Sequence, residues 1–159
     1  MRTLVVVLLF VVGLALASGA SLPPVVASHF ATGGVADGFM PRGEYLLLTV
    51  AVLVVAPLLI GSLASLINIL PVRFVNLPNR DYWLAPERRA DTLDTLRKHG
   101  NRLGIMLALY LFLIHGLVVL ANTQEPPRLS ETPLFIGTVV FLAGVVVWVW
   151  RFVAYFRRT

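Results

Sequence analysis

Three side chains of this sequence stand where they could do chemistry: two histidines and an aspartate. His29 and Asp37 lie in Leu22–Arg42, LPPVVASHFATGGVADGFMPR, a turn-rich segment between two apolar runs. His115 lies inside an apolar run that contains no Asp, Glu, Lys or Arg. Imidazole titrates near neutral pH and binds metals, so each histidine is a candidate ligand, proton acceptor or recognition contact. An ionisable residue at membrane depth is by default a functional candidate.

A structural role competes with the functional one at each of these positions. The ring of His29 can tie its own loop together, and an Asp37-Gly38 pair is typical of a turn. His115 can be a neutral histidine that hydrogen-bonds a carbonyl or a serine on a neighbouring helix. It lies about two turns from the end of its apolar run, close to the level of the Leu22–Arg42 segment. Because a buried polar ring without a partner costs about 1–3 kcal/mol, we expect His29, Asp37 and His115 to form one cluster.

Several kinds of site are excluded by what the sequence lacks. It contains no cysteine, which excludes disulfides, thiolate metal sites, iron–sulfur clusters and a cysteine nucleophile. A bis-histidine haem needs a second histidine at membrane depth on a facing helix, and only His115 lies inside an apolar run. We therefore expect no haem or other cofactor, and no metal site. The HExxH, phosphate-loop and GxSxG patterns are absent. An enzyme is therefore only the third of the functional hypotheses below.

The composition is that of a membrane protein. Hydrophobic residues make up 58% of the chain and charged residues 13%. Soluble domains have about 45–50% and about 25% respectively. With so few charges, a chain of 159 residues could not cover a water-facing surface.

Four apolar runs organise the chain as a single integral membrane domain, residues 1–159. We predict an all-α four-helix transmembrane bundle, with a structured outer loop over 21–44 and a cytoplasmic loop over 71–102. The predicted helices are about residues 3–20, 45–70, 103–121 and 134–156. Pro57 predicts a kink, and the four-residue spacing of Gly61 and Ser65 suits close helix packing. A short interfacial helix is expected from Pro86, with a stop or kink at Gly100-Asn101.

The first apolar run has two interpretations. Arg2, the run Thr3–Ala20 and its small residues resemble a cleavable signal peptide. The same run is also long enough for a short transmembrane helix. Because three more spanning segments follow, we favour a retained helix.

Basic residues predict the orientation. Eleven of them lie at the two termini and in the 71–102 loop, whereas Arg42 and Arg128 lie on the other side. The positive-inside rule then places both termini in the cytoplasm and the Leu22–Arg42 segment outside. Attraction to anionic lipid accounts for this charge, so no nucleic-acid partner is expected.

The outer segment resembles a known family. Leu22-Pro23, His29-Phe30, Gly34, Asp37-Gly38 and Arg42 are spaced as in a domain of unknown function found in small multi-pass bacterial membrane proteins. That family is related to the immunity protein against the sporulation-delaying toxin. The resemblance implies a multi-pass bundle in the inner membrane with this loop outside, and it implies no activity.

These observations favour a non-catalytic binding, sensing or accessory protein whose outer loop recognises a ligand or partner. The candidate binding residues are His29, Phe30, Asp37 and His115. A small transporter or ion pathway that uses His115 and His29 is the alternative, and an enzyme is third. Expected partners are the lipid bilayer and another membrane protein or a second copy of this chain.

Overall fold

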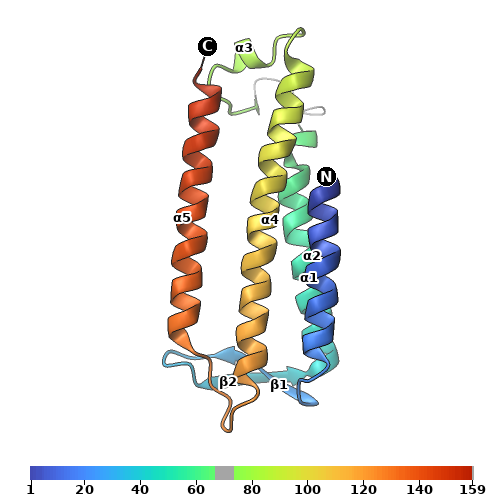
Figure 1. Ribbon diagram of the computed structural model, residues 1–159, viewed down its shortest axis with the longest axis vertical. Coiled ribbons are helices and arrows are strands. Elements are labelled where there is room, and N and C mark those ends of the chain that lie inside the picture. Colours follow the sequence, from blue (N-terminus) through green and yellow to red (C-terminus); the bar gives the residue numbers. More distant parts are fainter. Residues whose placement is uncertain (67–73, 159) are drawn as a thin grey trace.

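Four long helices form an elongated bundle with a β-hairpin across one end (Figure 1). The structure is a computed structural model that describes residues 1–66 and 74–158. These four helices are long and apolar enough to cross a membrane, which confirms the predicted helical, multi-pass architecture. They are α1 (Arg2–Gly19), α2 (Arg42–Leu66), α4 (Arg89–Ala121) and α5 (Glu131–Phe156).

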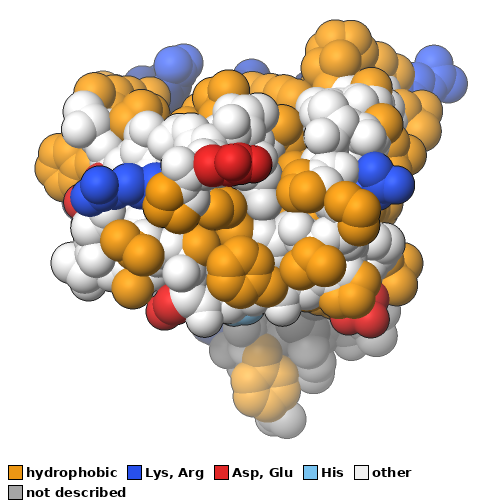
Figure 2. Space-filling view, turned by 90° about the horizontal axis from the view of Figure 1, so that it is seen from below, with side chains coloured by type: hydrophobic (Ala, Val, Ile, Leu, Met, Phe, Trp, Pro, Cys, Tyr) orange, Lys and Arg blue, Asp and Glu red, His pale blue; other side chains and the backbone are white. Residues whose placement is uncertain are grey.

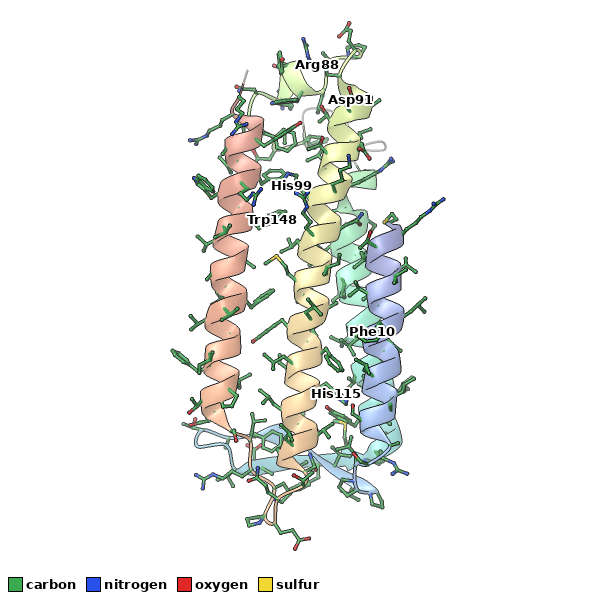
Figure 3. The ribbon with its side chains drawn as sticks, in the orientation of Figure 1. Phe10, Arg88, Asp91, His99, His115 and Trp148 are labelled. Carbon is green, nitrogen blue, oxygen red and sulfur yellow. The ribbon has the colours of Figure 1, made fainter. Side chains whose placement is uncertain are left out.

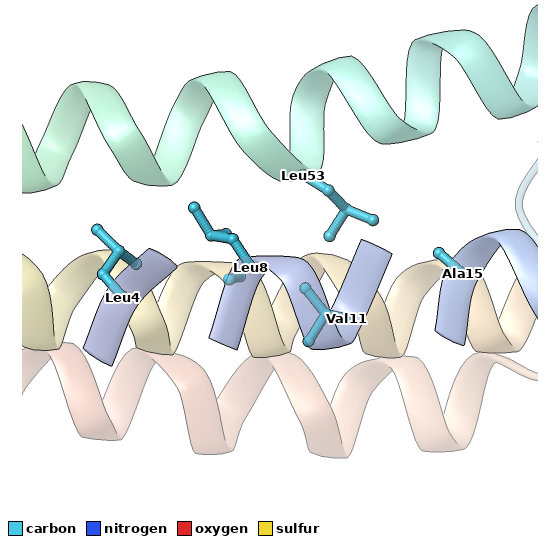
Figure 4. Packing of buried hydrophobic residues seen from close by; sticks show 6 residues of the cluster. Leu4, Leu8, Val11, Ala15 and Leu53 are labelled. Carbon is cyan, nitrogen blue, oxygen red and sulfur yellow. The ribbon is translucent and has the colours of Figure 1, made fainter. Parts of the chain in front are cut away.

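Helices α1, α2 and α4 pack around a common apolar core. Leu4, Leu8, Val11 and Ala15 recur every three or four residues along α1 and are buried against Leu53 and Ala108 (Figure 4). This spacing places them on one face of α1. The other faces of these helices keep exposed leucine and valine side chains, as expected of helices that contact lipid.

Small residues allow α2 and α4 to approach closely. A Cβ atom at Gly100 would lie 3.1 Å from the carbonyl oxygen of Ile60, and one at Gly104 would lie 2.8 Å from that of Pro57. On α2, Gly61 is buried at the same contact. The close approach expected at Gly61 is therefore present, and it uses two glycines of α4 that were not predicted to pack there.

The loop before the third span differs from the prediction. Instead of an interfacial helix that stops or kinks at Gly100-Asn101, the structure has the single turn α3 (Arg80–Trp83), and then α4 runs unbroken from Arg89. The expectation of a break at Gly100 was wrong, because this glycine serves the packing of α4 on α2. At about 1.5 Å per residue, α4 is longer than a bilayer is thick, so one end projects beyond the hydrocarbon.

Two strands join α1 to α2. Strands β1 (Val25–Phe30) and β2 (Ala36–Pro41) pair antiparallel as a hairpin, which was not predicted as strands. Its turn uses Gly33 and Gly34, both with positive φ, and a Cβ at Gly34 would collide with the carbonyl oxygen of Leu129. Glycine is thus required at this contact for both its conformation and its size.

The hairpin is fixed to both ends of the α4–α5 connection. The Asn122 side chain accepts from the Ala27 N–H at 2.8 Å and donates to the Ala27 carbonyl at 3.0 Å, as a neighbouring strand would. At the turn, the Gly33 N–H donates to the Glu131 carboxylate at 2.6 Å, and the Arg128 guanidinium donates to the Gly33 carbonyl at 3.1 Å. These contacts hold the hairpin as a lid across the helix ends.

At the opposite end, α5 is tied to α4 and to α3 by aromatic residues. The Trp83 indole donates to the Phe156 carbonyl at 2.8 Å, and the Trp148 indole donates to the His99 carbonyl at 3.0 Å. Leu96 and Phe156 are buried in the same cluster. Apart from Phe156, no α5 residue is buried, so this helix is the least enclosed of the four in the described chain.

Some predictions lie outside the described residues. These are the end of the second helix at Leu70 and the first residues of the predicted 71–102 loop. The same holds for the side chain of Ser65.

Candidate binding site beneath the hairpin

His115 joins three helices near the hairpin end. Its Nε2 lies 3.0 Å from the Ser18 hydroxyl on α1, and its Nδ1 lies 3.0 Å from the Tyr45 hydroxyl on α2. The Tyr45 and His115 rings also stack, with centroids 5.8 Å apart. His115 is only 2% exposed, and Figure 3 shows it pointing into the bundle from α4. A polar ring at membrane depth has thus found a partner for each of its nitrogens.

Both ring nitrogens of His115 lie within hydrogen-bond distance of a hydroxyl. The Ser18 hydroxyl donates to the Leu14 carbonyl at 2.8 Å, so its oxygen can accept from Nε2–H. The Tyr45 hydroxyl can then donate to Nδ1. A neutral imidazole with its proton on Nε2 fits both contacts. His115 thus links α4 to α1 and α2.

His115 also lines a cavity of about 260 Å³ between the hairpin and helices α2 and α4. Its walls are mostly apolar, with side chains such as Met40, Val52 and Ile114. Its polar groups come from both parts of the molecule: Ser28, His29, Tyr45, Thr49 and His115. Mostly apolar walls with a few converging polar groups are typical of small-molecule sites, although this volume lies just below their usual range.

A β-bulge brings His29 into this cavity. Ala27 pairs with Phe39 and His29 pairs with Gly38, so Ser28 is an extra residue on β1. Gly38 lies two residues from Met40, and alternate residues of a strand share a face. His29 is therefore on the face of Met40, above the helices. A Cβ at Gly38 would lie 2.8 Å from the Cβ of His29, so Gly38 leaves room for the histidine.

Of the predicted site residues, the structure brings two together at the cavity and separates two from it. His29 and His115 both line it. Phe30 is partly buried in a neighbouring apolar cluster with Leu22, Val26, Tyr45 and Val118. Asp37 is a second bulge residue, exposed on the other face of β2. The expected cluster is therefore present only in part, because Asp37 lies outside it. The hydrogen-bond partners of His115 are Ser18 and Tyr45, which agrees with the structural alternative of a serine on a neighbouring helix.

Sequence reasoning missed Ser18, Tyr45 and Asn122. Ser18 was a small residue of a possible cleavage site, Tyr45 marked the start of a helix and Asn122 the start of a connection. A weak signal existed for Tyr45, because a tyrosine at a membrane boundary often directs its hydroxyl to a polar partner. Nothing in the sequence alone indicates which helix faces His115.

An ion pathway would need a continuous polar lining, whereas the polar side chains of the described helices are dispersed. The Tyr110 hydroxyl lies 2.9 Å from that of Thr138 at the α4–α5 contact, and neither residue lines the hairpin cavity. Ser62 donates to its own helix at Leu59. Within residues 1–66 and 74–158, no group of three or more His, Asp or Glu side chains is placed to hold a metal ion.

Comparisons with known proteins add no relative. No family model, no curated protein and no solved structure matches this chain.

Proposed function

We propose that this protein is a non-catalytic binding protein of the membrane, whose hairpin end recognises a small amphipathic ligand. The observation that carries the proposal is the cavity shared by His29 of the hairpin and His115 of α4. If the hairpin only packed against the helices, no cavity with hydrogen-bonding groups from both the hairpin and the helices would be needed between them.

The chemistry of the walls indicates an amphipathic ligand. Leu48 and Val52 line the cavity and are 54% and 49% exposed on a membrane-spanning helix, so the opening borders lipid. The apolar part of a ligand would contact these side chains. Its polar group would meet His29, Ser28 and Thr49, because both ring nitrogens of His115 are already bonded.

Binding is favoured over transport by what lies below His115. Along the described helices, the interior toward the opposite end is the apolar core of Leu4, Leu8, Val11, Leu53 and Ala108. An ion pathway requires a polar lining through this region. A small transporter that uses His115 and His29 therefore stays the alternative, and in that case a second copy of the chain has to supply the lining.

The side of the membrane follows from charge. The hairpin end carries Arg42 and Arg128, whereas the other basic residues of the described chain belong to the opposite end. By the positive-inside rule, the hairpin faces outward and both termini are cytoplasmic. In Figure 2 the hairpin end presents apolar side chains between scattered charges, which suits contact with a partner or ligand at the membrane surface. The resemblance of Leu22–Arg42 to the immunity-related family stays a prediction consistent with this orientation.

The test is to fill the cavity and measure what the purified protein retains. Thr49→Trp places a large ring in the cavity, whereas Leu47→Trp places the same ring on a lipid-facing position of α2 that is 71% exposed. The three proteins are purified from native membranes, extracted with organic solvent and compared by mass spectrometry.

We expect one compound to be retained near stoichiometry by the wild type and by Leu47→Trp, and to be lost from Thr49→Trp. Equal retention by all three proteins, or no retained compound in the wild type, would contradict the binding function. His29→Ala supplies a milder test, because it removes a polar contact without filling the cavity.

A further inference from the structure

A second hollow lies at the opposite end of the molecule, between α4 and α5. One part, about 500 Å³, is lined by Lys98, Arg102, Arg151 and Arg158, with His99 and Tyr155 among the other residues. An adjoining part, about 590 Å³, is lined by Met106, Ala143, Gly144 and Val147. His99, Arg102 and Arg151 border both parts. The two form one groove, basic toward the end of the helices and apolar toward the middle of the membrane.

The positive charge of this groove is largely uncompensated. Lys98 pairs with Asp94 at 2.7 Å on the surface of α4. Among the described residues, no carboxylate forms an ion pair with Arg102, Arg151 or Arg158, and no acidic side chain lines either part of the groove. Three guanidinium groups that converge from two helices form a site for a phosphate, since arginine binds it with paired donors.

A second observation, independent of charge, points to a missing occupant. His99 is 8% exposed and lines both parts of the groove, yet its Nδ1 is buried without a hydrogen-bond partner in the described chain. Figure 3 shows His99 and Trp148 in the space between α4 and α5. The Trp148 indole bonds the His99 carbonyl, so it leaves the ring nitrogen unpaired. Buried polar atoms without partners are uncommon and call for an explanation.

We infer that this groove binds one anionic phospholipid. The phosphate and headgroup lie at Arg102, Arg151 and Arg158, and one acyl chain follows the apolar part past Met106 and Val147. Basic pockets between transmembrane helices at a headgroup boundary are suited to such lipids. The apolar run of the third span begins at Leu103, which places Arg102 and His99 at that boundary.

The continuous apolar part selects a lipid over a soluble anion. A free phosphate would use the arginines and leave the groove along Ala143, Gly144 and Val147 empty. The occupant also explains the loose contact of α5, because a lipid wedged between α4 and α5 would complete the packing of a helix with almost no buried residue of its own.

The experiment measures lipid binding to delipidated protein by native mass spectrometry. The probes are phosphatidylglycerol, the zwitterionic phosphatidylcholine and the soluble glycerol 3-phosphate. The groove variant is Arg102→Gln with Arg151→Gln. Its control, Arg2→Gln with Arg97→Gln, removes the same charge from exposed residues that do not line the groove.

We expect the wild type to prefer phosphatidylglycerol to phosphatidylcholine, and the groove variant to lose affinity for it by roughly 30-fold, about fivefold for each charge. The control pair should stay within about threefold of the wild type. An equal loss in both pairs would mean attraction by general surface charge and would overturn the site. Glycerol 3-phosphate that binds as tightly as phosphatidylglycerol would overturn its assignment to a lipid.

A third pair keeps the proposal testable if the charge variants do not fold. Ala143→Trp fills the apolar part of the groove with every charge intact, whereas Val146→Trp adds the same ring at a position that is 67% exposed. Phosphatidylglycerol affinity should fall at least tenfold in the first variant and stay unchanged in the second. Unchanged affinity in Ala143→Trp would exclude an acyl chain from the groove.

Discussion

Helix α4 carries two buried histidines whose surroundings differ in one decisive respect. His115 is 2% exposed and hydrogen-bonded at both ring nitrogens. His99 is 8% exposed, and its Nδ1 has no partner in the described chain. They lie about 24 Å apart along the helix, near its two membrane boundaries. The same type of side chain thus has hydrogen-bond partners for both ring nitrogens at one end, whereas at the other end one ring nitrogen has none.

The difference shows that burial alone does not identify a ligand site. At His115, contacts from α1 and α2 complete the ring, so a ligand of the hairpin cavity must bind chiefly through other groups such as His29. At His99, no partner for Nδ1 lies in the described chain. The two proposals therefore assign different occupants to the two ends: an amphipathic ligand below the hairpin and an anionic lipid between α4 and α5.

The largest expected effect concerns which end faces outward. The chain has no cysteine, so single cysteines label without background. Ala31→Cys lies at the hairpin turn and Ala90→Cys lies near the start of α4, and both positions are exposed. A membrane-impermeant maleimide should label Ala31→Cys on intact cells, and Ala90→Cys only after permeabilisation.

Ala90 is a better labelling position than the nearby Thr92, because Thr92 is buried. Thr92 is 2% exposed and its hydroxyl donates to the Trp83 carbonyl at 2.7 Å, so a cysteine there would label poorly from either side. Labelling of both positions on intact cells would contradict the predicted topology. Labelling of Ala90→Cys alone would reverse the orientation and place the basic groove in the outer leaflet.

The next effect separates the two histidines by stability. His115→Leu removes the hydrogen bonds to Ser18 and Tyr45 that join α4 to α1 and α2, so the free energy of unfolding should fall by about 1–3 kcal/mol. His99→Leu breaks no hydrogen bond of Nδ1 and keeps an apolar side chain among Trp148 and Phe152, so the free energy of unfolding should fall less than in His115→Leu. Unfolding in mixed micelles, followed by tryptophan fluorescence, measures both.

For lipid binding, we expect the larger effect in His99→Leu and the smaller one in His115→Leu. His99→Leu should weaken phosphatidylglycerol binding severalfold, and His115→Leu should leave it unchanged. Equal losses of stability in the two variants would contradict the contrast, and would mean that His99 has a partner within the protein.

A smaller effect tests how His29 is held over the cavity. Gly38→Ala places a methyl group against the Cβ of His29, so the hairpin should lose about 1–2 kcal/mol of stability through overpacking. Gly43→Ala is the control, because a Cβ there meets nothing within 4 Å and lies in the first turn of α2. Alanine should stabilise that helix slightly. Limited proteolysis between residues 25 and 41 would show the loosening, and equal protection in both variants would contradict it.

The helices could be predicted from sequence because each is specified by its own residues. A run of about twenty apolar residues has few alternatives to a spanning helix. The hairpin was missed because its strands are short and two bulges disturb the alternation that identifies strands. Its stability also depends on Asn122, Arg128 and Glu131, which are distant in sequence.

The site was predictable only in part for a related reason. The polarity of His115 within an apolar run showed that it needed a partner, and that much was correct. Which partner it found depends on the rotation of α1 and α2 about their axes, and no local pattern encodes this. The basic groove is similar: its arginines were counted as boundary markers, and only the packing of α5 on α4 shows that they converge.

The smallest expected effect sharpens the comparison at the basic end. Asp94 is exposed and pairs with Lys98 at 2.7 Å, in the i,i+4 order that stabilises a helix by only about 0.2–0.5 kcal/mol. Asp94→Asn should therefore leave stability almost unchanged. It also frees Lys98, which lines the groove, and removes the nearest negative charge. Phosphatidylglycerol affinity should rise by up to about fivefold, the contribution of one basic residue near the surface.

Asp81→Asn is the control, since it removes an equal charge from α3, away from the groove. The same rise in both variants would show that net charge, and not Lys98, sets the affinity. A fall in Asp94→Asn alone would show that the lipid is held by contacts that need the Asp94–Lys98 pair.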